Sequence, residues 1–269
     1  MSDWLDINRA YWDELVAPHL TAPSYDLTAL RNGGGLLHPI EEAELPPVAG
    51  RRVLHLQCHF GRDTLTLAQR GAEVTGVDFS APAIAAARGL AVELGLPARF
   101  VQSDLYAAPE ALPEPASFDL VFVTWGTTVW LPDLQRWAQV VAHFLKPGGL
   151  LYFADQHPAA FVFDDEAPGR DGMPGFYVPY FQTEALESDT RDYASDTPLR
   201  NTRIHSWVHP ISRMLGVLDA AGLQLDWLHE HDGVPWQMFR CLVPAAGGMY
   251  RWPDRPWLPL AYSLLAHRR

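Results

Sequence analysis

Cysteine is scarce in this chain. The only two cysteines, Cys58 and Cys241, are too few for a disulfide framework and do not stand in the spacing of a metal site. The eleven histidines are scattered, and no HxxxH pair falls on an expected helix. These scarcities argue against a disulfide-stapled secreted domain, and they predict a cytoplasmic protein without a metal cofactor.

Positive charge and long apolar runs are also lacking. The formal net charge is −12, and the only basic cluster is residues 267–269, so we expect no nucleic-acid partner. No apolar run reaches the length of a membrane span, and residues 1–6 are polar and acidic, unlike a signal peptide. We therefore expect no membrane partner either. The sequence carries no signal for the oligomeric state.

Core-forming residues are plentiful. Apolar residues make up 48% of the 269 residues and include ten tryptophans, enough for one large α/β domain. An apolar strand over residues 53–56 leads into a loop ending at Gly61, a helix over 62–69 follows, and a strand over 73–77 ends on Asp78. This order is typical of a nucleotide-binding βαβ unit, in which the turn aims N–H groups at the ligand and the acid accepts hydrogen bonds from ribose hydroxyls.

Strands and helices continue to alternate after this unit. Ser80 is a good N-cap, and the following helix is predicted to end before Gly95. The alternation predicts a doubly wound, Rossmann-like, mostly parallel sheet, whose ligands bind at the carboxyl ends of the strands. The later elements are expected at residues 99–102 (strand), 118–124 (strand), 131–145 (helix), 150–154 (strand), 210–221 (helix), 223–231 (strand) and 260–266 (strand).

The flanking segments differ from this alternating core. Residues 3–16 have the period of an amphipathic helix that Pro18 would end. Residues 159–208 are rich in proline, glycine, aspartate and aromatics, which predicts an irregular lid with an antiparallel hairpin, and residues 232–258 are expected to be loop. The chain is interpreted as a single domain with four parts: an N-terminal cap (1–50), a cofactor-binding core (51–158), a lid (159–208) and the C-terminal part of the sheet (209–269).

The region from residue 53 to 156 resembles the class I S-adenosylmethionine-dependent methyltransferases. Residues 56–61 stand at the place of that family's glycine-rich first motif, and residues 118–124 at the place of its fourth strand. The run Leu-Lys-Pro-Gly-Gly-Leu at 145–150 is similar to its helix-to-strand turn and is the most specific of these matches. The resemblance implies a seven-strand sheet whose last strand is antiparallel, with an N-terminal helical cap and an insertion after the fifth strand.

The same resemblance implies S-adenosylmethionine as cofactor, with S-adenosylhomocysteine as product and no metal. The first motif departs from the family, with His55 where an acid is common and Gln57 and His59 where glycines are common. These side chains stand where the backbone should approach the cofactor closely. From the motifs and the strand ends, the expected cofactor-binding residues are Tyr25, Gln57, Cys58, His59, Gly61, Asp78, Phe79, Asp104, Leu105, Thr124 and Trp125.

Methyl transfer needs a general base only when the nucleophile arrives protonated. His157, just past the fifth strand, is the first candidate base, and its alternative role is to order the proline turn that follows it. Arg31 is either a carboxylate partner or a solvated surface residue, and His209 either contacts substrate or caps a helix. The candidate substrate residues are Tyr11, Arg31, Trp130 and His209.

These features predict an enzyme that transfers a methyl group from S-adenosylmethionine to a small-molecule acceptor, on oxygen or nitrogen. Two alternatives remain open at this point. A catalytically inactive methyltransferase-like binding protein is one, because the first motif is altered. A dinucleotide-dependent oxidoreductase is the other, although it predicts a full GxGxxG motif that the sequence lacks.

Overall fold

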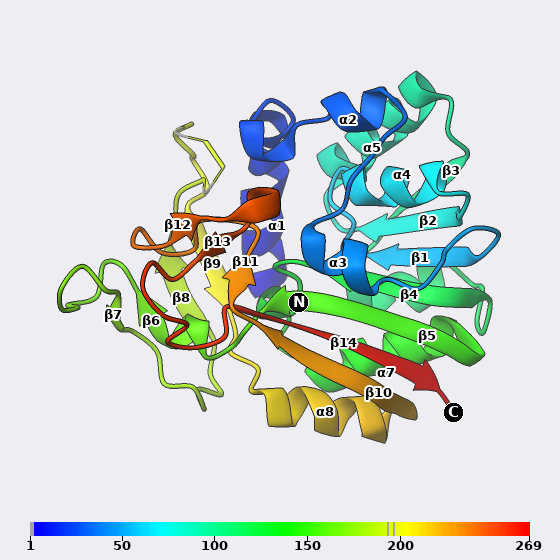
Figure 1. Cartoon of the computed structure of the whole chain (residues 1–269). Coiled ribbons are helices and arrows are strands. Elements are labelled where there is room, and N and C mark those ends of the chain that lie inside the picture. The colour runs from blue at the N-terminus through cyan, green and yellow to red at the C-terminus, as the bar shows by residue number, and fades with distance from the viewer. Residues whose placement is uncertain (1–2, 193, 196) are drawn as a thin grey trace.

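A seven-stranded sheet organises the fold (Figure 1). The computed structural model describes residues 3–192, 194–195 and 197–269. The sheet strands are β1 (Arg52–Leu56), β2 (Glu73–Asp78), β3 (Ala98–Gln102), β4 (Phe118–Thr124), β5 (Leu145–Gln156), β10 (Leu223–His231) and β14 (Ala261–Arg268). Their order is β10-β14-β5-β4-β1-β2-β3; β1 to β5 pair in parallel, and β14 is antiparallel to both of its neighbours. The predicted Rossmann-like sheet with an antiparallel last strand is confirmed.

The helices cover both faces of this sheet. They are α1 (Asp3–His19), α2 (Thr28–Arg31), α3 (Pro39–Glu44), α4 (Arg62–Gln69), α5 (Ala81–Leu94), α6 (Ala108–Ala111), α7 (Leu134–Phe144) and α8 (Ile211–Ala220). Local signals set several of these bounds. The Ser80 hydroxyl accepts a hydrogen bond from Ala83 N at 3.2 Å and so caps α5, and Gly95 ends that helix at φ 63°.

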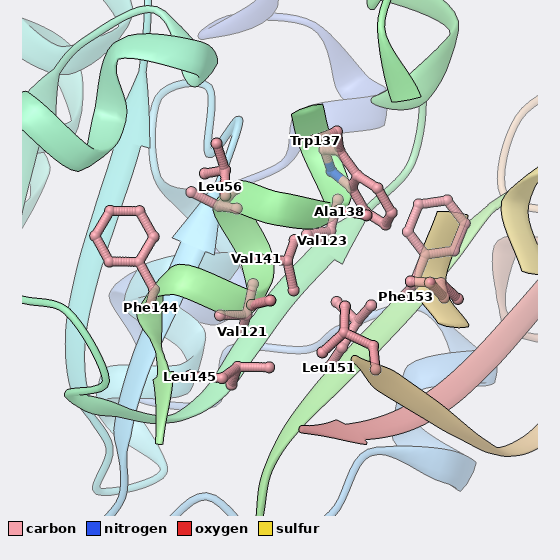
Figure 2. Close-up of a cluster of buried hydrophobic side chains, with 14 of the residues drawn as sticks. Leu56, Val121, Val123, Trp137, Ala138, Val141, Phe144, Leu145, Leu151 and Phe153 are labelled. Carbon is pink, nitrogen blue, oxygen red and sulfur yellow. The ribbon is translucent and has the colours of Figure 1, made fainter. Parts of the chain in front are cut away.

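The apolar core lies on both sides of the sheet because alternate residues of each buried strand face opposite ways. Val121 and Val123 of β4 belong to the cluster that includes Trp137 of α7 (Figure 2). Leu120 and Phe122 of the same strand pack on the opposite face, with residues of α4. All five side chains are fully buried, and each such burial stabilises the fold by roughly 1.5–3 kcal/mol.

Several predicted boundaries were wrong, and three of them have a clear local cause. Pro18 does not end α1, which continues to His19 with the proline in its last turn. Helix α7 begins at Leu134 rather than residue 131, because the Asp133 carboxylate accepts a hydrogen bond from Arg136 N at 3.0 Å and caps the helix there. Strand β5 begins at Leu145 rather than residue 150, since the Lys-Pro-Gly-Gly turn forms an irregularity within the strand's pairing with β4.

The predicted lid contains two antiparallel pairs rather than one hairpin. They are β6 (Phe163–Asp164) with β7 (Gly175–Phe176), and β8 (Leu186–Asp189) with β9 (Arg203–Ser206). Strand β9 is held against α1, because the Asn8 amide donates to His205 O at 2.9 Å and accepts from His205 N at 2.8 Å. Figure 1 shows these elements gathered beyond the arrowheads of β1, β2, β4 and β5.

The segment predicted as loop over residues 232–258 also contains strands. β11 (Gly233–Val234), β13 (Tyr250–Arg251) and β12 (Val243–Pro244) form a three-stranded antiparallel sheet beside the lid (Figure 1). Strands of two residues are too short to show an alternating pattern, and a proline in one of them disfavours a strand prediction. In the described part of the chain, no helix has the length and apolar character needed to span a membrane.

Candidate functional site

A cavity of about 720 Å³ lies at the carboxyl ends of the parallel strands. Its walls come from α1, the loop after β1, the ends of β2, β3 and β4, the lid, and the loop after β11. This is where a doubly wound sheet is expected to bind its ligand, and the volume is that of a site for one or two small molecules.

The loop after β1 adopts a left-handed backbone at three positions, Gln57 (φ 57°), His59 (φ 50°) and Gly61 (φ 79°). Gly61 is required here, since a Cβ would lie 2.8 Å from the ring of Phe100. The Gln57 amide donates to Thr127 O at 3.0 Å, and the His59 ring lies edge-on to Trp12 at 5.5 Å. Both side chains line the cavity without filling it, as does the neighbouring Cys58.

Asp78 connects this loop to the following helix. One carboxylate oxygen accepts from His59 N at 2.8 Å and the other from Ser80 N at 2.9 Å. The side chain lines the cavity together with Phe79, and burial raises the pKa of Asp78 to about 6. The carboxylate therefore keeps free lone pairs at the cavity wall, where hydroxyl donors of a ligand can reach them.

Asp104 and Leu105 line the cavity at the end of β3. The Asp104 carboxylate accepts from Tyr106 N at 3.0 Å, which makes it the N-cap of a short 3-10 helix (Leu105–Ala107). Asp104 thus caps this helix and also lines the cavity. Asp104 lies one strand further from β1 than Asp78 does, because β2 stands between β1 and β3 in the sheet.

Thr124 and Trp125 close the end of β4. Trp125 has a left-handed backbone (φ 53°), and its indole donates to the carboxyl of Glu41. Glu41 is 0% exposed, and burial raises its pKa to about 8, so this carboxyl is protonated at neutral pH. The Trp125 ring stands nearly perpendicular to Trp236, at 84° with centroids 5.9 Å apart, and both rings line the cavity.

The N-terminal cap and the lid meet at the opposite wall. Tyr11 and Trp130 line the cavity with their ring centroids 6.0 Å apart, and the Tyr11 hydroxyl donates to Arg191 O. Tyr25 also lines it and stacks at 4.7 Å on His19. The His19 ring lies 3.0 Å from the Asp192 carboxylate, and both of these side chains are fully buried. Asp192 of the lid thereby contacts His19, the ring on which Tyr25 stacks.

Most predicted site residues thus line one cavity. Four of them do not: Gly61, Arg31, His157 and His209. Gly61 packs against Phe100 and Ala87 instead. Arg31 is half exposed and pairs with Glu93 at 2.7 Å on the surface, which matches its alternative interpretation. The His209 ring contacts Leu131 O at 2.8 Å beside a separate small void, and it does not cap α8, whose N-cap is Pro210.

The expectation of His157 as the base is not supported by its position. The ring is buried outside the cavity: its Nδ1 accepts from Ala159 N at 3.1 Å, and its Nε2 lies 3.0 Å from Glu230. The contact to Ala159 orders the chain after Pro158, which is the alternative considered from the sequence. Strand-end position placed this residue near the ligand, but the side chain faces the β14 side, where it meets Tyr262 at 5.8 Å.

The cavity residues missed by the sequence reasoning include His38, Asp63 and Trp236. His38 precedes α3, Asp63 lies in the first turn of α4, and Trp236 follows β11. The Asp63 position next to the first motif was a usable signal, since side chains there start the helix that faces the ligand. No local pattern marks His38 or Trp236, because both reach the cavity through long-range folding of loops.

The fold and this cavity together define a protein with a nucleotide-type site at the switch point of a doubly wound sheet. A family model described as a methyltransferase domain matches residues 53–149. The ubiquinone biosynthesis O-methyltransferase of Pseudomonas fluorescens is 31% identical over 188 residues, which is 68% of this chain and 72% of that protein. The chain therefore belongs to the class I S-adenosylmethionine-dependent methyltransferases.

Other similarities are shorter or more distant. The ubiquinone biosynthesis O-methyltransferase of Photorhabdus laumondii is 31% identical over 107 residues, and the match spans 40% of this chain but only 43% of that protein's length. An S-adenosylmethionine-dependent methyltransferase from Mesorhizobium loti superposes with a TM-score of 0.58 at 21% identity, covering 86% of this chain and 96% of that one. The crystal structure of the [4+2]-cyclase SpnF gives 0.56 at 17%, covering 97% and 95%. At such identities the structural matches show the shared fold.

Proposed function

We propose that the protein transfers a methyl group from S-adenosylmethionine to a hydroxyl group of a small-molecule acceptor. The observation that carries this proposal is the single cavity, which extends from the acids at the ends of β2 and β3 to an aromatic wall under the lid. Donor and acceptor would share it and be held next to each other, which is the main requirement of an in-line displacement.

The residues present fit this cofactor. Asp78 would accept hydrogen bonds from the ribose hydroxyls, and Asp104 with Leu105 would hold the adenine. The loop over residues 57–61 would follow the methionine part towards Tyr25. Support comes from the donor set: two carboxylates on adjacent strand ends face one cavity of about 720 Å³. When bound, S-adenosylmethionine supplies a methyl group on a positively charged sulfur that is its own leaving group.

The acceptor side is argued from the remaining walls. Tyr11, Trp130, Trp125 and Trp236 present ring faces and edges, which suit a flat, partly apolar acceptor and exclude water from the reaction. The names of the curated relatives, which are O-methyltransferases, favour oxygen over nitrogen as the methylated atom.

The test begins with calorimetric titration of the purified protein with S-adenosylmethionine and S-adenosylhomocysteine, with NADH as control. We expect micromolar binding of both sulfur compounds and none of NADH. A panel of hydroxylated and amino aromatic compounds is then screened for release of S-adenosylhomocysteine, and hydroxyl compounds should be methylated.

A second reading is an inactive binding protein, favoured by the side chains of Gln57 and His59 in the cofactor loop. It predicts cofactor binding without methylation of any compound in the panel. Absence of binding by both sulfur compounds would refute the proposed function itself.

A further inference from the structure

Three histidines line the cavity, and their surroundings differ. His55 is 3% exposed in β1, and its Nδ1 is hydrogen-bonded to the Thr64 hydroxyl at 2.8 Å. His59 has its Nε2 buried without a partner among the described residues, and burial lowers the pKa of its ring to about 3. Neither ring is suited to take up a proton from a ligand at neutral pH.

His38 is the third, and it is only half-buried. Within the described part of the chain no hydrogen-bond partner contacts its ring, and its nitrogens are not among the buried unpartnered atoms. Burial lowers its pKa, Asp63 opposes this shift, and Arg62 adds to it. The imidazole is therefore neutral at pH 7 and has a lone pair to offer from the cavity wall.

The groups around His38 hold the ring in place, and one of them, Asp63, favours its protonated form. Its ring meets the Trp125 ring at 89° with centroids 5.8 Å apart, and the Glu41 carboxyl fixes that indole from behind. Asp63 also lines the cavity and is close enough to raise the pKa of His38. Its buried Oδ1 has no hydrogen-bond partner among the described residues and lies 3.6 Å from the Arg62 guanidinium. A carboxylate in this position stabilises an imidazolium that forms during reaction.

We propose that His38 is the general base of this site and that the acceptor is a weakly acidic hydroxyl compound such as a phenol. The inference rests on the proposed function. The ring nitrogen takes the hydroxyl proton while an electron pair of the oxygen forms the bond to the methyl carbon. The carbon–sulfur bond breaks with its electrons going to sulfur, which leaves a neutral thioether, and the imidazolium then gives its proton to water. Asp63 is a positioning residue that stabilises the imidazolium.

The geometry distinguishes this assignment from a structural role. A structural histidine uses a ring nitrogen within the protein, as His157 does where its Nδ1 accepts from Ala159 N. His38 lines the cavity and packs against Trp125 through its ring, and its nitrogens have no hydrogen-bond partner among the described residues. It is also beside the aromatic wall assigned to the acceptor, since Trp125 contacts both His38 and Trp236.

The experiment compares His38→Gln with His157→Gln, a matched histidine variant outside the cavity. The first readout requires no turnover: 4-nitrophenol is titrated into each protein saturated with S-adenosylhomocysteine, and its phenolate absorbance is followed at slightly acidic pH. The wild type and His157→Gln should increase the phenolate fraction on binding, because imidazolium and phenolate form a pair. His38→Gln should lose this increase and keep its affinity for S-adenosylhomocysteine.

The second readout is methylation across phenols of decreasing pKa. His38→Gln should lower kcat for phenol about 10²- to 10⁴-fold, and less for 4-nitrophenol, which ionises without help. The fall of kcat at acid pH that the wild type shows should also be absent from His38→Gln. The other ionisable groups near His38 are Asp63 and Arg62 of α4 and Glu41 of α3. Equal kcat in His38→Gln and wild type, or no phenolate increase in the wild type, would overturn the assignment. A wild type that methylates nothing would instead refute the proposed function.

Discussion

Replacing Asp78 by asparagine tests the cofactor side of the cavity. The carboxylate accepts two backbone N–H groups and would accept two ribose hydroxyls of the cofactor. An amide of the same shape keeps one acceptor oxygen and loses the charge. Since hydrogen bonds to charged groups contribute about 1.5–3 kcal/mol and neutral ones about 0.5–1.5 kcal/mol, the loss over two hydroxyls is about 2–3 kcal/mol. Affinity for S-adenosylhomocysteine should fall roughly 30- to 150-fold.

The pH dependence of binding gives a second measure of the same contact. Burial raises the pKa of Asp78 from 3.8 to about 6 in the free protein, and the ionised form is the better acceptor for hydroxyl donors. Wild-type affinity should therefore rise as pH increases through about 6 and level off above it. The asparagine variant has no ionisable group here and should bind with a nearly flat pH profile.

The assay is calorimetric titration with S-adenosylhomocysteine over this pH range. Asp133→Asn is the matched control, because Asp133 also accepts a backbone N–H at a helix N-terminus but does not line the cavity. Its affinity should equal that of the wild type. The reasoning is refuted if Asp78→Asn binds like the wild type, or if both lose affinity to the same extent.

Three further predictions concern packing, ionisation and the acceptor wall. Gly61→Ala should lower the free energy of unfolding by about 2–4 kcal/mol in urea denaturation, because the added methyl group would clash with Phe100 at a left-handed backbone position. The control Gly95→Ala has the same backbone region (φ 63°) but open space around the methyl group, so it should lower this free energy by only about 1–2 kcal/mol. Glu41 has a pKa of about 8 in the folded protein, against an ordinary value of 4.5, so its contribution to stability is fully present below about pH 4.5 and is lost as the pH rises towards 8. The melting temperature of Glu41→Gln should therefore rise relative to that of the wild type between these pH values. A difference in melting temperature that stays constant with pH would contradict the raised pKa. Trp236→Ala should raise the acceptor KM about tenfold by removing the partner of Trp125, with unchanged cofactor affinity; the opposite pattern would assign Trp236 to the cofactor.

Local chemistry made much of the fold predictable from the sequence. The helix over residues 62–69 and the strands over 118–124 and 223–231 have the predicted bounds, because caps, glycines and continuous apolar runs mark them. The beginning of α7 was misplaced because the prediction followed the apolar residues from 131 onward, whereas the Asp133 cap fixes the first helical residue at Leu134. The small sheet of β11, β12 and β13 was missed because two-residue strands are defined by their partners rather than by their own pattern.

The site was predictable where the backbone positions the side chain. Asp78 and Asp104 stand at strand ends, so the parallel sheet brings both to one edge irrespective of the details of the loops. His157 stands at such an end too, but its side chain faces away from the cavity, and strand-end position does not encode that direction. His38 could not be predicted, since its place in the cavity depends on α3 packing over the sheet through Trp125 and Glu41.

The place of β14 has a consequence for the synthesis of this protein. β14 is made after the other six strands of its sheet, yet it lies between β5 and β10 in the finished sheet. Until residues 261–268 have left the ribosome, the nascent chain carries β5 as an open edge whose outer backbone N–H and C=O groups lack the partners that β14 supplies in the folded sheet. A ribosome stalled before this strand would display an unpaired strand edge, and chaperones bind chains with such exposed edges.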